Sequence, residues 1–81
     1  MWFIYILQCS DGSLYTGSTN DIERRFTLHM SGKGAKYTRS HRPNNIIHTE
    51  KFLTKSEAFK REREIKTWTR KEKINRLKLK I

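Results

Sequence analysis

The sequence has few of the residues that indicate a secreted, disulfide-bonded or membrane protein. It has one cysteine, Cys9, so no internal disulfide can form, and no Cys or His stands beside it at metal-ligand spacing. The apolar run "MWFIYIL" is too short to cross a bilayer and has no basic leader or small-residue cleavage site. We therefore expect a cytoplasmic protein in which Cys9 is a packed thiol.

Acidic residues are scarce relative to basic ones. The 81 residues include 18 lysines and arginines but only 8 aspartates and glutamates, giving a formal net charge of +10 at pH 7. Such an excess attracts polyanions, and nucleic acid is the commonest one for a compact basic domain. A membrane surface would instead require a basic amphipathic helix with free bulky apolar residues. Those residues are needed here for the core, so a nucleic-acid partner is predicted and a membrane is not.

The first two apolar runs predict a β-hairpin. "WFIYILQ" and "LYTGST" are rich in β-branched and aromatic residues and flank "SDGS", which favours a three-residue turn ending at a left-handed Gly12. That turn places Tyr5 opposite Gly17 and Leu7 opposite Tyr15, so both tyrosines share one face of the sheet. The gap left by Gly17 is then expected to admit the backbone of a ligand.

A helix is expected after the hairpin, beginning at Asp21 with Asn20 as its N-cap. Ile22, Phe26 and Met30 recur every four residues and mark its buried stripe. The segment "SGKGAKYTRSHRPNN" has two glycines, a proline and little periodicity, which predicts a basic loop. "IIHTEKFL" alternates well enough for a third strand.

Two capping boxes open the remaining helices. Thr54 with Glu57 starts one, and Thr69 with Glu72 starts the last. The apolar face of the last helix is expected to carry three residues: Ile74, Leu77 and Ile81. The predicted fold class is α+β, a three-stranded antiparallel sheet flanked by helices in the order β-β-α-β-α-α, within one domain spanning 1–81.

Glu62 is a carboxylate on an apolar helix face. At 100° per residue it falls between Phe59 and Ile65, where it costs several kcal/mol unless it has a partner. One interpretation is a structural ion pair with an arginine. The other is a hard divalent cation such as Mg²⁺, which takes oxygen ligands and keeps water and substrate phosphate as the remaining ones.

Four other side chains complete the groups that phosphodiester hydrolysis needs. Tyr5 and Tyr15 share a sheet face, and Arg25 and His29 are one helical turn apart. Each alone has a structural explanation, as a packed tyrosine, a surface ion pair or a helix-end histidine. Together with Glu62, a tyrosine can deprotonate water, the arginine can stabilise the charged transition state, and the histidine can relay protons.

These residues resemble those of the GIY-YIG nucleases. "FIY" at 3 to 5 and "YTG" at 15 to 17 are similar to the two halves of the family's motif, and Arg25 follows Gly17 by eight residues, with His29 one turn later. "SEAFKRE" at 56 to 62 resembles the family's Ser-Glu-Ala-x-x-x-Glu segment. "GKGAKYTRSHRP" and "EIKTWTR" are most similar to the small bacterial single-domain members. Similar segments occur in nuclease subunits that process branched DNA.

The resemblance implies a role for each site residue. Tyr15 would be the general base with Tyr5 assisting it, Arg25 would stabilise the transition state, and Glu62 would hold one Mg²⁺ or Mn²⁺ ion. Phe3 and Thr16 depart from the name-giving motif at strand positions that tolerate variation. Some members carry an asparagine twelve residues after the glutamate, where this chain has Ile74. Asn75 is adjacent, but a helix rotates it by about 100°.

Basic side chains outside this set are candidates for binding nucleic acid. The predicted binding residues, all in the basic loop, are Lys33, Lys36, Tyr37, Arg39 and Arg42. The cations, with His41 among them, can follow phosphates while the tyrosine stacks on a base; a solvated charge run is the alternative. The lysines of the last helix are expected to form a general electrostatic surface: Lys71, Lys73, Lys78 and Lys80.

The leading hypothesis is a divalent-metal-dependent endonuclease that hydrolyses DNA, in branched or single-stranded form, with DNA favoured over RNA. The alternative is a non-catalytic DNA- or RNA-binding module with the same fold. A partner protein could supply specificity, since a chain of this size has no evident element for reading sequence.

Overall fold

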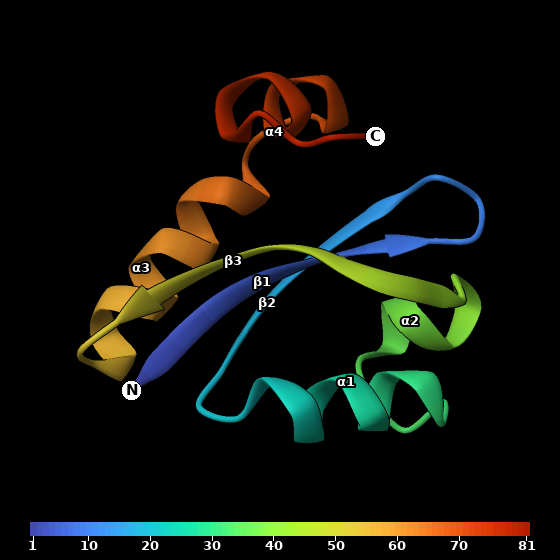
Figure 1. Cartoon of the computed structure of the whole chain (residues 1–81), viewed down its shortest axis with the longest axis horizontal. Coiled ribbons are helices and arrows are strands. Elements are labelled where there is room, and N and C mark those ends of the chain that lie inside the picture. The colour runs from blue at the N-terminus through green and yellow to red at the C-terminus, as the bar shows by residue number, and fades with distance from the viewer.

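The computed structural model describes residues 1–81 and contains a three-stranded antiparallel sheet with four helices (Figure 1). The strands are β1 (Trp2–Cys9), β2 (Leu14–Thr19) and β3 (Pro43–Phe52), in the spatial order β2-β1-β3. The helices are α1 (Ile22–Met30), α2 (Lys36–Ser40), α3 (Lys55–Lys66) and α4 (Arg70–Leu77). The predicted fold class and order are confirmed, with α2 as an additional short helix. None of the helices has the length and apolar character needed to cross a membrane.

The hairpin has the predicted register. Tyr5 pairs with Gly17 and Leu7 with Tyr15. Gly12 has φ 85°, a left-handed conformation that glycine adopts without steric cost, and its N–H donates to the Cys9 carbonyl at 2.9 Å. The two tyrosines therefore lie on the same face of the sheet, as expected.

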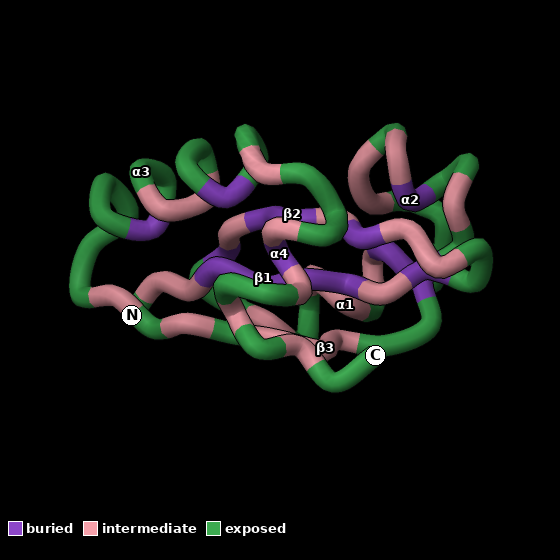
Figure 2. Tube along the Cα trace, turned by 90° about the horizontal axis from the view of Figure 1, so that it is seen from above, coloured by how far each residue is buried: buried purple, intermediate pink, exposed green.

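Central strand β1 is buried on both faces. Its residues Ile4, Tyr5, Ile6 and Leu7 are each at most 2% exposed, and Figure 2 shows burial concentrated along the sheet, with exposed residues on the outer turns of the helices. Successive side chains of a strand point to opposite faces. A strand covered on both sides therefore appears in the sequence as a continuous apolar run.

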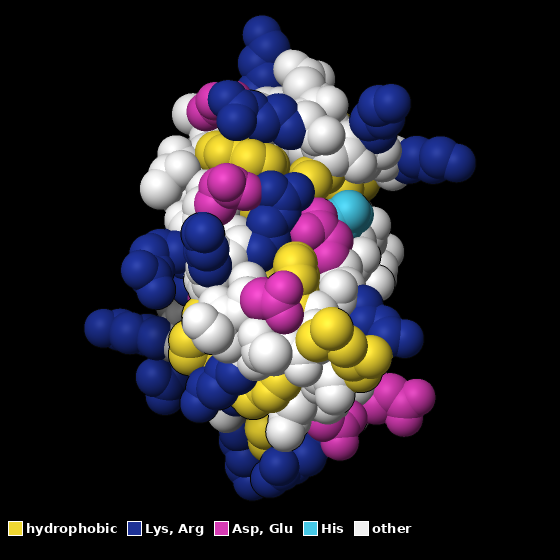
Figure 3. Space-filling view, turned by 90° about the vertical axis from the view of Figure 1, so that its left-hand side faces the viewer, with side chains coloured by type: hydrophobic (Ala, Val, Ile, Leu, Met, Phe, Trp, Pro, Cys, Tyr) yellow, Lys and Arg dark blue, Asp and Glu magenta, His cyan; other side chains and the backbone are white.

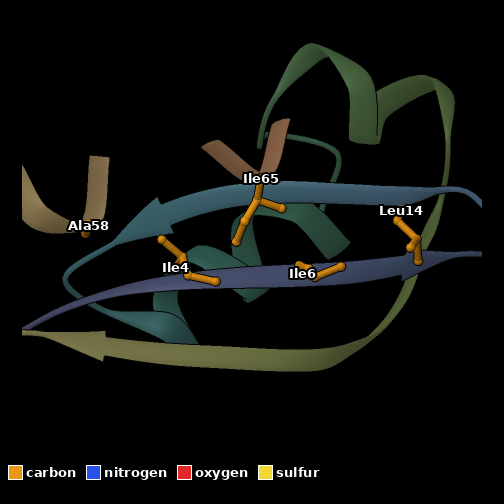
Figure 4. Close-up of a cluster of buried hydrophobic side chains, with 5 residues drawn as sticks. All are labelled: Ile4, Ile6, Leu14, Ala58 and Ile65. Carbon is orange, nitrogen blue, oxygen red and sulfur yellow. The ribbon is translucent and has the colours of Figure 1, made fainter. Parts of the chain in front are cut away.

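One face of the sheet carries the hydrophobic core. The core cluster, shown in Figure 4, consists of Ile4, Ile6, Leu14, Ala58 and Ile65. Helix α3 thus covers the even-numbered face of β1, and Trp68, Ile74 and Leu77 pack against the same cluster. Helices α1 and α2 lie on the other side of the sheet (Figure 1).

Several predicted boundaries were wrong. The N-cap of α1 is Asp21 rather than Asn20, and its carboxylate accepts from the Arg24 N–H at 3.1 Å. Met30 is 47% exposed, so it does not belong to a buried stripe. Both capping boxes are present as predicted, but α4 ends at Leu77. Ile81 lies beyond it and is 45% exposed.

The segment predicted to be a loop contains more structure than its composition suggests. Helix α2 is only five residues long, too short for a hydrophobic period to be visible. Strand β3 begins at Pro43, earlier than predicted, because its polar start pairs with the end of β1 through Gln8 and Cys9. A register shift between Ile6 and Leu7 also breaks the alternation in β3.

Lys73 is not part of a solvent-exposed surface, contrary to expectation. It is 8% exposed, and its Nζ donates to Thr16 Oγ1 of β2 at 3.1 Å. Burial, with a contribution from nearby Lys66, lowers the pKa of Lys73. It forms no ion pair with any carboxylate, so the Thr16 hydroxyl is the acceptor on which this buried ammonium depends.

Because Lys73 lacks a carboxylate partner, its charge should not stabilise the fold. We expect Lys73→Met to leave the free energy of unfolding unchanged or raise it, since a buried charge is costly to desolvate. Thr16→Val should lower it by about 1–3 kcal/mol by leaving the ammonium without an acceptor. In the Lys73→Met background the same change should cost much less. Urea unfolding of wild type, the two single variants and the double variant measures these free energies. An equal cost of Thr16→Val in both backgrounds would contradict the dependence of Lys73 on the Thr16 hydroxyl.

Candidate active site

Residues from both faces of the sheet meet beside its edge strand β2. A cavity of about 350 Å³ is lined by Tyr5 of β1, Tyr15 of β2, Arg25 of α1 and Glu62 of α3. Because β2 is an edge strand, helices that cover opposite faces can both reach around it. The structure thus brings together four of the five side chains predicted to be catalytic. The fifth, His29, lies behind Tyr5 and contacts it.

Two glycines make space for Tyr5 and His29 rather than for a ligand. A Cβ added to Gly17 would lie 2.5 Å from the Tyr5 hydroxyl and 3.1 Å from a ring carbon of Tyr15. A Cβ on Gly34 would collide with the imidazole of His29. The expectation that Gly17 leaves room for a ligand's backbone is therefore wrong, because the Tyr5 ring occupies that room.

A buried hydrogen-bonded chain fixes the protonation of His29. Its Nδ1 lies 2.7 Å from Thr38 Oγ1, and the Thr38 hydroxyl donates to the Ala35 carbonyl at 2.9 Å. Thr38 has only one proton to donate, so it must accept from His29 Nδ1–H. The Nε2 atom is then the acceptor, and the Tyr5 hydroxyl donates to it at 2.8 Å.

The electrostatic environment keeps both members of this pair neutral. Burial raises the pKa of Tyr5 to about 12, despite the opposing effect of Arg25. Burial and the positive charge of Arg25 lower the pKa of His29 to about 4. The phenol of Tyr5 in turn raises the pKa of Arg25. At neutral pH the site therefore has a protonated tyrosine, a neutral histidine and a charged arginine.

The carboxylate of Glu62 lies at the cavity wall and is partly buried, with 19% of its side chain exposed. It accepts a short hydrogen bond from Ser18 Oγ, and Lys66 Nζ lies 2.6 Å from its Oε2. Its cationic partner is therefore a lysine one turn along α3 rather than an arginine.

The residues present fit a single hard divalent cation. No group of three or more His, Cys, Asp or Glu side chains is close enough to form a protein-only metal site. Mg²⁺ does not need one, because it binds through one or two carboxylates and keeps water and phosphate oxygens. Glu62 faces a cavity where such ligands have access. Asn75 is exposed and does not line this cavity.

The predicted nucleic-acid-binding residues fall into separate groups. Arg39 and Arg42 line a second cavity of about 400 Å³, which lies on the Thr38 side of His29. Tyr37 is already stacked, with its ring centroid 4.0 Å from that of His41 and 5.7 Å from that of Tyr15. Two further members of the set, Lys33 and Lys36, are exposed and line neither cavity.

Sequence reasoning missed the polar residues that hold Glu62 and His29 in place. Ser18, Lys66 and Thr38 bind Glu62 or His29, but serines, threonines and lysines of this kind occur throughout such a chain. The available signal for Lys66 was its position four residues after Glu62, the spacing of a helical ion pair. Thr38 had no signal, since α2 itself was not foreseen.

The fold and this site define a GIY-YIG catalytic domain. Residues 1–75 match the model of that family, whose description is "GIY-YIG catalytic domain". The chain therefore belongs to the GIY-YIG family, and the resemblance drawn from its sequence motifs is confirmed.

Similar proteins are small bacterial proteins named UPF0213. The chain is 54% identical over 72 residues to one from Staphylococcus epidermidis, covering 89% of this chain and 88% of the relative. It is 53% identical over 76 residues to one from Staphylococcus aureus, covering 94% and 93%. The solution NMR structure of a UPF0213 protein from Bacillus halodurans superimposes with a TM-score of 0.61 at 46% identity, covering 96% of this chain and 84% of that one. A solution NMR structure of a protein from E. faecalis superimposes with a TM-score of 0.65 at 54% identity, covering 94% of this chain and 81% of that one.

The burial of a neutral His29 should make stability depend on pH. The unfolded chain takes up the proton near the ordinary pKa of 6.5, while the folded protein does so only at about 4. This contribution to stability is complete above pH 6.5 and is lost as the pH falls toward 4. The loss reaches up to about 3 kcal/mol at 1.36 kcal/mol per pKa unit.

We expect urea unfolding between pH 7 and pH 4 to show this acid-induced loss. It should shrink in His29→Gln, which cannot take up a proton, and persist in the matched control His41→Gln. An identical pH dependence in wild type and His29→Gln would contradict the buried neutral imidazole.

Proposed function

We propose that this protein is a divalent-metal-dependent endonuclease that hydrolyses phosphodiester bonds of DNA. The observation that carries this proposal is the shared cavity of Tyr5, Tyr15, Arg25 and Glu62 in a domain with a net charge of +10. Membership of the GIY-YIG family supports a nucleic-acid substrate. We favour branched or single-stranded DNA, of the kind that arises during repair, because a chain of 81 residues has no evident element for reading a duplex sequence.

The two tyrosines take different roles in this proposal. Tyr5 is bonded to His29 and has a pKa of about 12, so it keeps its proton and is a poor base in the free protein. This supports Tyr15 as the general base, which removes a proton from the attacking water. The hydroxide forms the new bond to phosphorus while the bond to the leaving oxygen breaks, and water returns a proton to that oxygen.

The remaining groups stabilise charge. Arg25 is positively charged and lines the cavity beside both phenols, where it can neutralise the phosphoryl oxygens as negative charge develops. Glu62 would hold one Mg²⁺ or Mn²⁺ ion, which when bound supplies further charge neutralisation and helps the leaving oxygen. His29 orients Tyr5 through Nε2, and Thr38 holds the required tautomer.

A second candidate function is a nucleic-acid-binding module without turnover. One observation favours it: Glu62 already has two partners, Ser18 and Lys66, that satisfy its carboxylate without a metal. The two functions share the basic surface and differ in cleavage alone.

The test of the proposed function is cleavage of labelled single-stranded, duplex and branched DNA, with an RNA control, in Mg²⁺ or Mn²⁺. We expect Glu62→Gln to abolish metal-dependent cleavage with DNA affinity largely retained, because it removes the ionic ligand and keeps the side-chain shape. The control Glu64→Gln, two residues away on α3 and outside the cavity, should cleave normally. Binding without cleavage on every substrate by the wild type would favour the binding module.

Arg25 and Arg24 form a natural matched pair, since they are adjacent and carry the same charge but only Arg25 lines the cavity. We expect Arg25→Ala to lower kcat by about 100-fold or more, as expected for loss of a group that stabilises the transition state. Arg24→Ala should have a small effect that added salt weakens further. Single-turnover cleavage rates of the two variants measure this difference. Equal losses of rate would mean that both arginines act only through general electrostatic attraction.

A further inference from the structure

One end of the cavity has a different chemical character from the catalytic end. Besides the polar residues, it is lined by Trp2, Lys55 and Phe59. The aromatic rings of Trp2 and Phe59 meet edge to face, with centroids 5.8 Å apart and planes at 87°. The Lys55 ammonium lies 5.4 Å from the Trp2 ring and 5.1 Å from the Phe59 ring. None of these three belongs to the set that sequence reasoning linked to chemistry.

Helix geometry places this group directly beside the candidate metal ligand. Lys55, Phe59 and Glu62 are spaced by four and three residues on α3, so they lie on one stripe of the helix in successive turns. That stripe faces the cavity along its whole length. A phosphate near Glu62 would therefore have an aromatic ring one helical turn away and a cation one turn beyond it.

Core packing does not account for Phe59. Its side chain is 41% exposed, and it is not among the hydrophobic residues that pack on the core cluster, whereas Trp2 is. Figure 3 looks at the end of the molecule that carries the N-terminus and α3, and it shows hydrophobic side chains reaching the surface among basic ones. Phe59 and Glu62 also line a neighbouring cavity of about 280 Å³ together with Arg63 and Lys66. Cations therefore lie on both sides of an exposed ring.

An exposed aromatic between cations, continuous with a phosphate-hydrolysing site, matches the chemistry of one nucleotide unit. A nucleobase stacks on an aromatic face with little regard to its identity, while lysines and arginines follow the phosphates on either side. A protein segment would not require cations at both ends of the ring, and a lipid surface would require more exposed apolar area than this.

We propose that Trp2, Lys55 and Phe59 form a nucleotide subsite next to the scissile phosphate. An unpaired base stacks on Phe59, which Trp2 supports from the sheet, and the adjoining phosphate contacts Lys55. The base must be unstacked from its neighbours to enter, so the subsite selects single-stranded flanks over continuous duplex. This inference rests on the proposed function for the position of the scissile phosphate, but base-dependent binding at Phe59 does not require cleavage.

The experiment compares two oligonucleotides of equal length and charge without divalent metal, so that nothing is cut. One is a fluorescently labelled oligothymidylate, and the other carries the same label on abasic deoxyribose phosphates. Fluorescence anisotropy at fixed salt gives their affinities for wild type and for three variants: Phe59→Ala, Phe59→Tyr and Leu53→Ala. Leu53 is the matched control, because it is 76% exposed and lines no part of the cavity.

We expect Phe59→Ala to weaken binding of oligothymidylate by roughly 10-fold, the loss typical of one base–aromatic stack. Phe59→Tyr, which keeps the ring, and Leu53→Ala should bind as wild type does. The abasic oligonucleotide should bind wild type more weakly and be insensitive to Phe59→Ala. In a Trp68→Phe background, Trp2 is the remaining tryptophan. Oligothymidylate should quench the fluorescence of Trp2, and the abasic strand should not.

Equal affinity of wild type and Phe59→Ala for oligothymidylate would overturn the subsite, whether or not the protein cleaves DNA. Base-dependent binding that needs Phe59, in a protein that cleaves no substrate in Mg²⁺ or Mn²⁺, would support the subsite and refute the nuclease. No binding of either oligonucleotide at low salt would overturn the subsite, whereas the cleavage test with branched DNA in Mg²⁺ or Mn²⁺ would still decide the nuclease.

Discussion

Burial of strand β1 on both faces is the constraint from which the arrangement of the other elements follows. Ile4 and Ile6 face α3, while Tyr5 faces α1, and each is at most 2% exposed. Helices must therefore cover both sides of a sheet that is only three strands wide. With β1 in the centre and β2 at the edge, the two helical layers approach each other around β2, and the candidate site forms there.

The polar groups of the site are held by contacts that also stabilise the fold. The chain from Tyr5 through His29 to Thr38 and the Ala35 carbonyl joins β1, α1 and α2 with its N-cap. Every member is satisfied, and no buried side-chain nitrogen or oxygen in the protein lacks a partner. Fully satisfied buried networks are rigid. The orientation of the Tyr5 hydroxyl is thus a consequence of folding, and it does not have to be created when a substrate binds.

The cavity has two chemically distinct parts, and this bears on substrate choice. Charged and hydroxyl groups gather around Arg25 and Glu62, whereas Trp2, Phe59 and Lys55 line the part of the cavity next to Glu62. General electrostatic attraction accounts for affinity without preference. The proposed preference for unpaired DNA rests on the aromatic part of the cavity, because backbone contacts alone do not distinguish one phosphate from another.

The local patterns of the sequence were sufficient for the class of the fold, the hairpin register, both capping boxes and the four predicted side chains that line the cavity. These features depend on neighbours within a few positions, such as the Asp11-Gly12 turn that places Tyr5 opposite Gly17. Family membership rests on the same motifs. What only the tertiary structure decided were contacts between residues far apart in the chain: Ser18 with Glu62, Lys73 with Thr16, and Thr38 with His29. Serine, threonine and lysine are equally compatible with solvent, so their roles depend on which helix packs over which strand, and no local pattern encodes that.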